Sequence, residues 1–366
     1  MLSGNSLNDA LHALRGGRSP LEVATHLMPN NPSALYELAE RLRKDQPIGE
    51  LEALEAILKA VLLKTFDKAE VSGAEAREIA SLQQEIGFLM KYKSYAVKAS
   101  TPLGYSIFLQ RPGQGFSFQQ HLTKKVEIFR VLSVSERSLI FICDFQTWEN
   151  RFEPEAFQGW LNGEPNSLYD SLCTVPVPGD VVIIDQLRVV HSVIGCVIDE
   201  FANDSTDLVD RLFDQNRGES VPQFFNRQYS EAEIREISPP TQHSALSFTS
   251  EGIQRKPIQP IVVPGGRKTQ FGKVGFIASA FMFEPDQSSG LMETGDYAVT
   301  LHVRAGTANI AIGHRSEFRN ALPTPLAASA GDVLLLPKQM CYEVSCHGPG
   351  ETEIVEHKLP WEFAFQ

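Results

Sequence analysis

The sequence predicts an α+β protein in which an all-helical N-terminal domain precedes two β-barrels. Apolar residues recur at helical spacing up to about residue 95, and from residue 96 the pattern changes to short β-rich runs separated by turn residues. Two such β-rich stretches contain a repeated motif. A chain of 366 residues has room for two or three domains. We therefore expect a helical domain over 1–95, a first barrel over 96–235 and a second barrel over 236–366.

The helical prediction rests on apolar stripes and on helix-start signals. The clearest stripe places six apolar side chains on one helix face: Leu51, Leu54, Ile57, Leu58, Val61 and Leu62. Ser19-Pro20-Leu21-Glu22 combines a cap, a proline in the first turn and a glutamate three residues after the cap. Ser72 and Glu75 open the last helix in the same way. No catalytic group of residues accompanies these stripes, so we assign the domain to packing or oligomerisation.

The two β-rich stretches repeat each other. Pro178-Gly179-Asp180 and Ala330-Gly331-Asp332 each precede a run of four apolar residues. Two further pairs of segments match in the same order: Phe129–Leu132 with Leu301–Arg304, and Ser138–Phe141 with Asn309–Ile312. Short strands at this spacing favour a sandwich or barrel over βαβ units. Two copies of one β-domain explain the repeat.

The charge balance restricts the partners. The formal net charge is −12, from 45 acidic and 33 basic residues, which offers no basic surface to nucleic acid or to an anionic membrane. No apolar run reaches the ~18–20 residues that span a bilayer, and the N-terminal residues lack the pattern of a signal peptide. We expect a cytoplasmic protein that binds neither partner. Its five cysteines form no CxxC pair and are expected to be reduced and mostly buried.

The residues that carry chemistry lie in the first barrel. His121 and Glu127 are six residues apart, so in one extended strand both side chains would point to the same face. His191 follows the Pro178-Gly179-Asp180 turn and an apolar strand, and a neighbouring strand of the same barrel would bring it alongside. Two imidazoles and one carboxylate suit a divalent metal, Fe, Mn or Zn, and leave positions open for a substrate.

This pattern resembles the cupin superfamily, whose fold is a double-stranded β-helix or jelly-roll barrel. The first cupin motif is a glycine-flanked His-x-His with a glutamate three or four residues later, and the second is Pro-Gly-Asp followed by a strand and a histidine. His121, Glu127, Pro178-Gly179-Asp180 and His191 match these motifs in order and spacing. The resemblance implies a bicupin with one metal site, for which His121, Glu127 and His191 are the ligands.

The sequence departs from the cupin pattern at one ligand. Leu122 or Thr123 stands where the family has the second histidine of its first motif. The resemblance then implies that Gln119, Thr123, Glu200 or water completes the metal site.

Two segments are similar to the sugar-handling branch of the cupins. Val197–Leu212 looks like the corresponding segment of mannose-6-phosphate-isomerase-like and sialic-acid-synthase-associated cupins. Lys125-Val126-Glu127 is similar to the Lys-x-Glu of that group and of D-lyxose-isomerase-type cupins. The similarity implies a metal site that faces a hydroxyl-rich small molecule.

The second barrel lacks these ligands. Tyr342 or Glu343 stands at the position of His191, and the counterpart of the first motif has no His/Glu pair. Cys341 and Cys346 are five residues apart and would face opposite sides of a strand. We therefore expect no metal there, and assign the second barrel to scaffolding or to a homodimer interface.

Three functions follow from these observations. The first is a metal-dependent isomerase or epimerase of a sugar-like substrate, with Glu200 or Lys125 as the base that moves a proton next to a carbonyl. The second is a non-haem iron dioxygenase, which uses the same set of two histidines and one carboxylate. The third is a non-catalytic, sugar-binding or regulatory bicupin.

Overall fold

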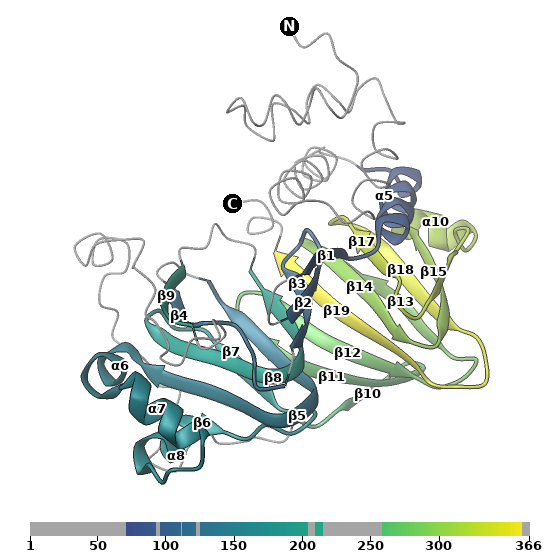
Figure 1. Ribbon diagram of the computed structural model, residues 1–366. Helices are drawn as coiled ribbons and strands as arrows, with labels where there is room; N and C mark the ends of the chain where they lie inside the picture. The colour runs from purple at the N-terminus through teal and green to yellow at the C-terminus, as the bar shows by residue number, and fades with distance from the viewer. Residues whose placement is uncertain are drawn as a thin grey trace, which may run out of the picture. The chain divides into compact units, whose positions relative to one another are not determined.

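The computed structural model of the protein consists mainly of antiparallel β-strands (Figure 1). It describes residues 71–92, 96–110, 112–121, 125–203, 209–214 and 258–360. Most of the helical domain predicted over 1–95 lies outside the described residues, as do Leu122, Thr123 and the boundary predicted at 235/236. No helix within the described ranges is long and apolar enough to cross a membrane.

The chain divides into two compact units. The first β unit contains Tyr92–Lys98 and the described residues between Ser106 and Ile258. The second β unit contains the described residues up to Lys91, the segment Ala99–Tyr105 and those from Gln259 onward. All five cysteines are free thiols, as predicted, and four of them are buried.

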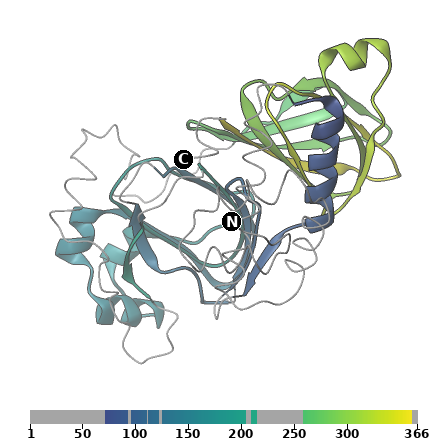
Figure 2. The ribbon, with the colours of Figure 1, turned by 90° about the horizontal axis from the view of Figure 1, so that it is seen from above.

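The predicted last helix is present as α5 (Gly73–Ile86). The Ser72 hydroxyl accepts a hydrogen bond from the Glu75 amide, and the Glu75 carboxylate accepts one from the Ser72 amide, which closes a capping box. The helix lies across the strands of the second β unit, where Ala76 and Ala80 join the core (Figure 2). Helical continuation to residue 95 was a wrong prediction, because α5 ends at Ile86 and Leu89–Tyr92 is strand β1.

The strands of the first β unit belong to a nine-stranded sheet, with β1-β2-β3-β8-β4-β9 in order and β5 joining β6, β7 and β8. The long strands β5 and β8 change register between Val134 and Leu139. Opposite this break, Gly195 adopts a positive φ of 69°. The remaining strands are β2 (Ala96–Ser100), β3 (Tyr105–Gln110), β4 (Phe118–His121), β5 (Glu127–Asp144), β6 (Cys173–Thr174), β7 (Val181–Ile184), β8 (Val189–Ala202) and β9 (Val209–Phe213).

Three short helices between β5 and β6 were not predicted. They are α6 (Phe145–Arg151), α7 (Pro154–Leu161) and α8 (Ser167–Leu172). They lie together at one end of the first β unit (Figures 1 and 2). Their aromatic side chains pack around Phe118 of β4, so they support the strand that ends at His121.

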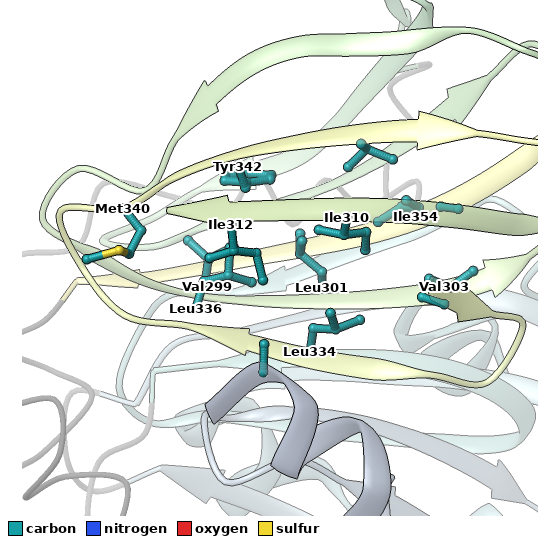
Figure 3. Packing of buried hydrophobic residues seen from close by; sticks show 14 of the residues in the cluster. Val299, Leu301, Val303, Ile310, Ile312, Leu334, Leu336, Met340, Tyr342 and Ile354 are labelled. Atoms are coloured by element: carbon teal, nitrogen blue, oxygen red, sulfur yellow. The ribbon is translucent and has the colours of Figure 1, made fainter. Parts of the chain in front are cut away.

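Two sheets form the second β unit and enclose one hydrophobic core (Figure 3). Their strand orders are β10-β11-β12-β19-β14-β17 and β13-β18-β15-β16. Leu301 and Leu334 from the first sheet and Ile310 and Tyr342 from the second line this core. The elements are β10 (Ile261–Val263), β11 (Gly266–Lys273), β12 (Ile277–Phe283), β13 (Ser288–Glu293), β14 (Tyr297–Ala305), β15 (Thr307–Gly313), α10 (Arg315–Asn320), β16 (Leu326–Ser329), β17 (Val333–Leu336), β18 (Cys341–Cys346) and β19 (Thr352–Pro360).

The predicted repeat is confirmed at the level of single hydrogen bonds. Gly179 and Gly331 both adopt positive φ, 94° and 99°, at the turns before β7 and β17. The Gly179 amide donates to the Val131 carbonyl at 2.8 Å, and the Gly331 amide donates to the Val303 carbonyl at 2.7 Å. Val131 of β5 and Val303 of β14 are therefore equivalent positions.

The strand pairings extend this equivalence and correct one part of the sequence alignment. Ile140 pairs with Thr174, which lies six residues before Asp180 of the first turn. Ile310 pairs with Leu326, which lies six residues before Asp332 of the second turn. Ser138–Phe141 therefore matches 308–311, one residue earlier than predicted from sequence.

The same register decides which residue of the second unit corresponds to His191. Ile142 pairs with His191, as Ile312 pairs with Tyr342. The residues three positions earlier, Arg188 and Gln339, share an unusual positive φ, 61° and 63°. Tyr342, rather than Glu343, therefore occupies the position of His191.

Candidate metal centre

Three strands of the first β unit bring the three predicted ligands together. His121 is the last residue of β4, Glu127 is the first residue of β5 and His191 is the third residue of β8. Their exposed fractions are 0, 1 and 1%. The predicted grouping is present, but its derivation was wrong: His121 and Glu127 belong to two different strands and do not share one face of a single strand.

Both imidazoles approach the same carboxylate oxygen. His121 Nε2 lies 3.1 Å from Glu127 Oε2, at hydrogen-bonding distance. His191 Nε2 lies 3.3 Å from the same oxygen, without the alignment of a hydrogen bond. The other oxygen, Glu127 Oε1, accepts a charged contact from Lys125 Nζ at 2.6 Å. One oxygen of Glu127 thus faces the two histidines and the other faces the lysine.

Packing and a backbone contact fix the orientation of His191. Its Nδ1 lies 3.1 Å from the Val189 carbonyl, so Nδ1 carries the proton that this contact requires and Nε2 is left as an acceptor. The rings of Phe116 and Phe129 lie 6.1 and 6.0 Å from the imidazole. Aromatic walls of this kind exclude water and hold a ligand ring in place.

The charges around Glu127 keep it ionised. Burial by itself raises the pKa of its carboxyl group, but the Lys125 ammonium and the His121 imidazole outweigh burial. The pKa is therefore held well below its ordinary value. An ionised carboxylate beside two imidazoles is a set of donors for a cation.

The geometry fits a divalent metal. The three donor atoms all lie within 4.8 Å of one another. Nitrogen and oxygen ligands at ~2.0–2.2 Å from one ion are themselves about 3.0–3.5 Å apart, the range in which the two contacts to Glu127 Oε2 fall. His191 Nε2 is buried and makes no hydrogen bond within the described part of the chain, which is costly unless a ligand engages it. These residues therefore fit the metal that the sequence predicts.

The residues proposed to complete the site differ in their positions. Gln119 pairs directly with His191 and is two residues before His121, so it belongs to the strand face that carries both histidines. Thr123 lies outside the described residues. Glu200 pairs with Phe129, two residues after Glu127, and therefore shares the face of Glu127. Gln119 and Glu200 thus remain on the side of the sheet that carries the three donors.

Sequence reasoning missed Lys98. Its Nζ lies 3.8 Å from Glu200 Oε1 and 5.0 Å from the centre of the Phe108 ring. A signal existed in the repeat, because Lys268 of the second β unit likewise stacks on Phe281, at 4.6 Å, and pairs with a buried glutamate, Glu356. A lysine that recurs in both copies of a repeat marks an interior ion pair of the fold.

The second β unit has other residues at the positions of the three donors. Val299 pairs with Leu336 as Glu127 pairs with Ile184, and Tyr342 takes the place of His191. Met292 pairs with Tyr342 as Gln119 pairs with His191, which places Thr294 at the position of His121. Within the described residues, His121, Glu127 and His191 form the one group of His, Cys, Asp and Glu donors with this spacing.

Comparisons with known proteins find structures but no sequence relatives. No family model matches the chain, and no curated protein matches it. The similar solved structures include a mannose 6-phosphate isomerase from Bacillus subtilis, with 14% identity, a TM-score of 0.43 and coverage of 69% of this chain and 74% of that one.

An oxalate decarboxylase from Lactobacillus farciminis, in a formate complex, has 12% identity and a TM-score of 0.44, over 75% of this chain and 84% of that one. An 11S globulin from Wrightia tinctoria has 10% identity and a TM-score of 0.47, over 75 and 82%.

Proposed function

We propose that the first β unit is a metal-dependent enzyme, an isomerase or epimerase of a sugar or a similar hydroxylated small molecule. The observation that carries the proposal is the approach of two buried imidazole nitrogens to one oxygen of the ionised Glu127. In this proposal His121, Glu127 and His191 hold one divalent metal, Fe, Mn or Zn. The bound metal supplies a Lewis acid that polarises a carbonyl group.

Two residues are candidates for the proton transfer. The Lys125 ammonium is 2.6 Å from Glu127 Oε1, which suits it to orienting the ligand carboxylate. The Glu200 carboxylate is buried, at 7% exposure, and its Oε1 lies 3.8 Å from Lys98 Nζ. We assign the base to Glu200 and the orienting role to Lys125. Replacing Glu200 by Gln should then abolish turnover, whereas replacing Lys125 by Met should lower metal affinity.

The substrate class rests on sequence. The similarity of Val197–Leu212 and of Lys125-Val126-Glu127 to sugar-handling cupins supports a hydroxylated ligand. Glu200 lies within the first of these segments and faces the side of the sheet that carries Glu127. A homodimer stays a prediction, to be measured by light scattering on the full chain.

One observation favours a second function, a non-haem iron dioxygenase. Two histidines and one carboxylate are the donor set that leaves adjacent positions open for O2 and substrate. A dioxygenase would use the same three ligands, with iron as the metal and O2 as the co-substrate.

The deciding experiment is metal analysis followed by anaerobic assay. The purified protein should contain about one metal per chain by mass spectrometry, and His191→Ala should lose it. With Mn or Zn and no O2, incubation in D2O with a panel of aldoses and ketoses should exchange the proton beside the carbonyl of one of them. O2 consumption that depends on substrate after loading with Fe(II) would instead establish the dioxygenase. Protein that binds none of these metals overturns both functions and leaves a non-catalytic bicupin.

A further inference from the structure

The second β unit contains a buried charged cluster that includes Tyr342, the residue at the position of His191. The Glu356 carboxylate is fully buried and accepts hydrogen bonds from the Tyr342 hydroxyl at 2.5 Å and from the Ser279 hydroxyl at 2.9 Å. Two ammonium groups are close to it, Lys268 Nζ at 3.1 Å and Lys358 Nζ at 3.3 Å. Tyr342 also packs on the aliphatic core of this unit (Figure 3).

The electrostatics define the protonation of this cluster. Burial raises the pKa of Glu356, but the ammonium groups of Lys358 and Lys268 outweigh burial and lower it. Burial, and then the charge of Glu356, raise the pKa of Tyr342 well above its ordinary value. The cluster therefore holds an ionised carboxylate, a neutral phenol and two ammonium groups, so cations already surround the carboxylate.

The strand register relates this cluster to the first β unit residue by residue. Phe129 pairs with Glu200 as Leu301 pairs with Glu356, so the two glutamates are equivalent. Two residues further along the same strand, Ala202 corresponds to Lys358. Both units therefore keep an interior glutamate, and they differ at the position two residues after it.

That position lies directly opposite the residue at the centre of the donor set. Ala202 pairs with Glu127 in the first unit, and Lys358 pairs with Val299 in the second. Residues directly opposite in an antiparallel pair point to the same face. Ala202 is buried and adds one methyl group beside Glu127, whereas the partly buried Lys358 side chain reaches the exposed Glu293 carbonyl, to which its Nζ donates at 2.9 Å.

We infer that metal binding in the first β unit requires the small, uncharged Ala202, and that Lys358 supplies an internal cation at the equivalent position of the second unit. Ala202 leaves the space beside Glu127 to an external cation, and Lys358 supplies a covalently attached cation in the second unit. An ammonium is a compact point charge that replaces part of the charge of a metal and repels a further cation. The inference rests on the metal site of the proposed function and names a residue outside the donor set on which that site depends.

The test is to give the first unit the lysine of the second. Ala202→Lys in the full chain should reduce bound Zn or Mn from about one equivalent to none, measured by mass spectrometry and titration calorimetry. Ala202→Met adds a chain of similar length without charge. Without metal, A202K should melt above A202M, because its ammonium gives the Glu127 carboxylate a second cationic partner beside Lys125, as Glu356 has two. An A202K protein that still binds one equivalent, or that melts below A202M, overturns the inference.

The reciprocal variant tests the second unit independently of the first. Lys358→Met should leave the metal content at one equivalent and lower the melting temperature, because Glu356 then loses one of its two ammonium partners. An unchanged melting temperature for K358M overturns the inference, since Lys358 would then not serve as the internal cation. Wild-type protein that binds no metal overturns the proposed function instead, so the two failures are distinguishable.

Discussion

The imidazole rings of His121 and His191 lie face to face, with ring centres 5.0 Å apart and planes inclined by 26°. Both rings direct Nε2 at the same oxygen of Glu127. Two imidazole nitrogens that face one carboxylate oxygen are donors that can share a single divalent cation with that oxygen. The ligand geometry is thus formed by the fold before any metal binds.

The first prediction concerns the charge of Glu127. Glu127→Gln keeps the shape of the side chain and removes the anionic ligand, so we expect the affinity for Zn or Mn to fall by more than about 100-fold, since loss of even an outer-shell partner costs ~10–100-fold. Titration calorimetry measures it. Glu200→Gln is the matched control, because it removes a carboxylate from the same sheet face and should leave one equivalent bound. Equal affinities for wild type and E127Q would contradict the ligand assignment.

The second prediction concerns acid stability. Burial, with Arg304 as a second cause, lowers the pKa of His302 to about 3, and burial lowers that of His357 to about 3. In the unfolded chain a histidine binds a proton below about pH 6.5, whereas these two do so in the folded protein only near pH 3. Stability is therefore full above pH 6.5 and is lost as the pH falls toward 3.

The size of this loss is measurable. Each histidine contributes about 1.4 kcal/mol per pH unit within that window, so each should cost about 2 kcal/mol between pH 6.5 and 5. Urea unfolding at the two pH values measures the slope. His302→Gln removes the titrating ring next to Tyr105 and should flatten the slope by about half of the combined effect of the two histidines. An identical slope in H302Q would contradict the assignment of His302.

The third prediction concerns the support behind β4. Phe118 is fully buried, and five aromatic rings have centres 4.8–5.7 Å from its own. Phe118→Ala should destabilise the protein by about 3–5 kcal/mol in urea unfolding. It should also weaken metal binding, because β4 ends at His121. Phe118→Leu fills most of the space and should keep the metal; if F118A binds metal as tightly as F118L, β4 does not depend on this cluster.

The parts of the fold that could be predicted from sequence are local. The helix start at Ser72 and the two Gly-Asp turns depend on side chains within three or four residues, and those residues determine the capping box and the positive φ at Gly179 and Gly331. The signals for α6 to α8 were also present, with Asp144 and Asn166 as caps and Pro154 in a first turn. These helices were not predicted because the β-rich segments on both sides favoured strands throughout the region.

The candidate site was predicted for a reason that the structure does not support. One extended strand was expected to align His121 with Glu127, but the residues belong to β4 and β5, and the pairing of Gln119 with His191 brings β4 alongside β8. Such pairings join residues far apart in sequence, and no local pattern encodes them. The role of Lys358 could not be predicted from sequence either, because it depends on the strand pairing that makes Lys358 equivalent to Ala202.

The last prediction uses the repeated turn as an internal comparison. Gly179 and Gly331 have φ of 94° and 99°, and a Cβ added at either would meet no atom within 4 Å. Replacement by Ala therefore causes backbone strain without a clash, and each variant should lose about 1 kcal/mol in urea unfolding. The two losses should agree, because both turns make the same pair of hydrogen bonds to Val131 or Val303.

Gly195→Ala is the contrasting variant. The φ of Gly195 is 69°, and a Cβ added there would lie 2.9 Å from the Ser135 hydroxyl, so the loss of stability should exceed that of both other variants. A G195A variant as stable as G179A would contradict the view that Gly195 is needed where β8 bends.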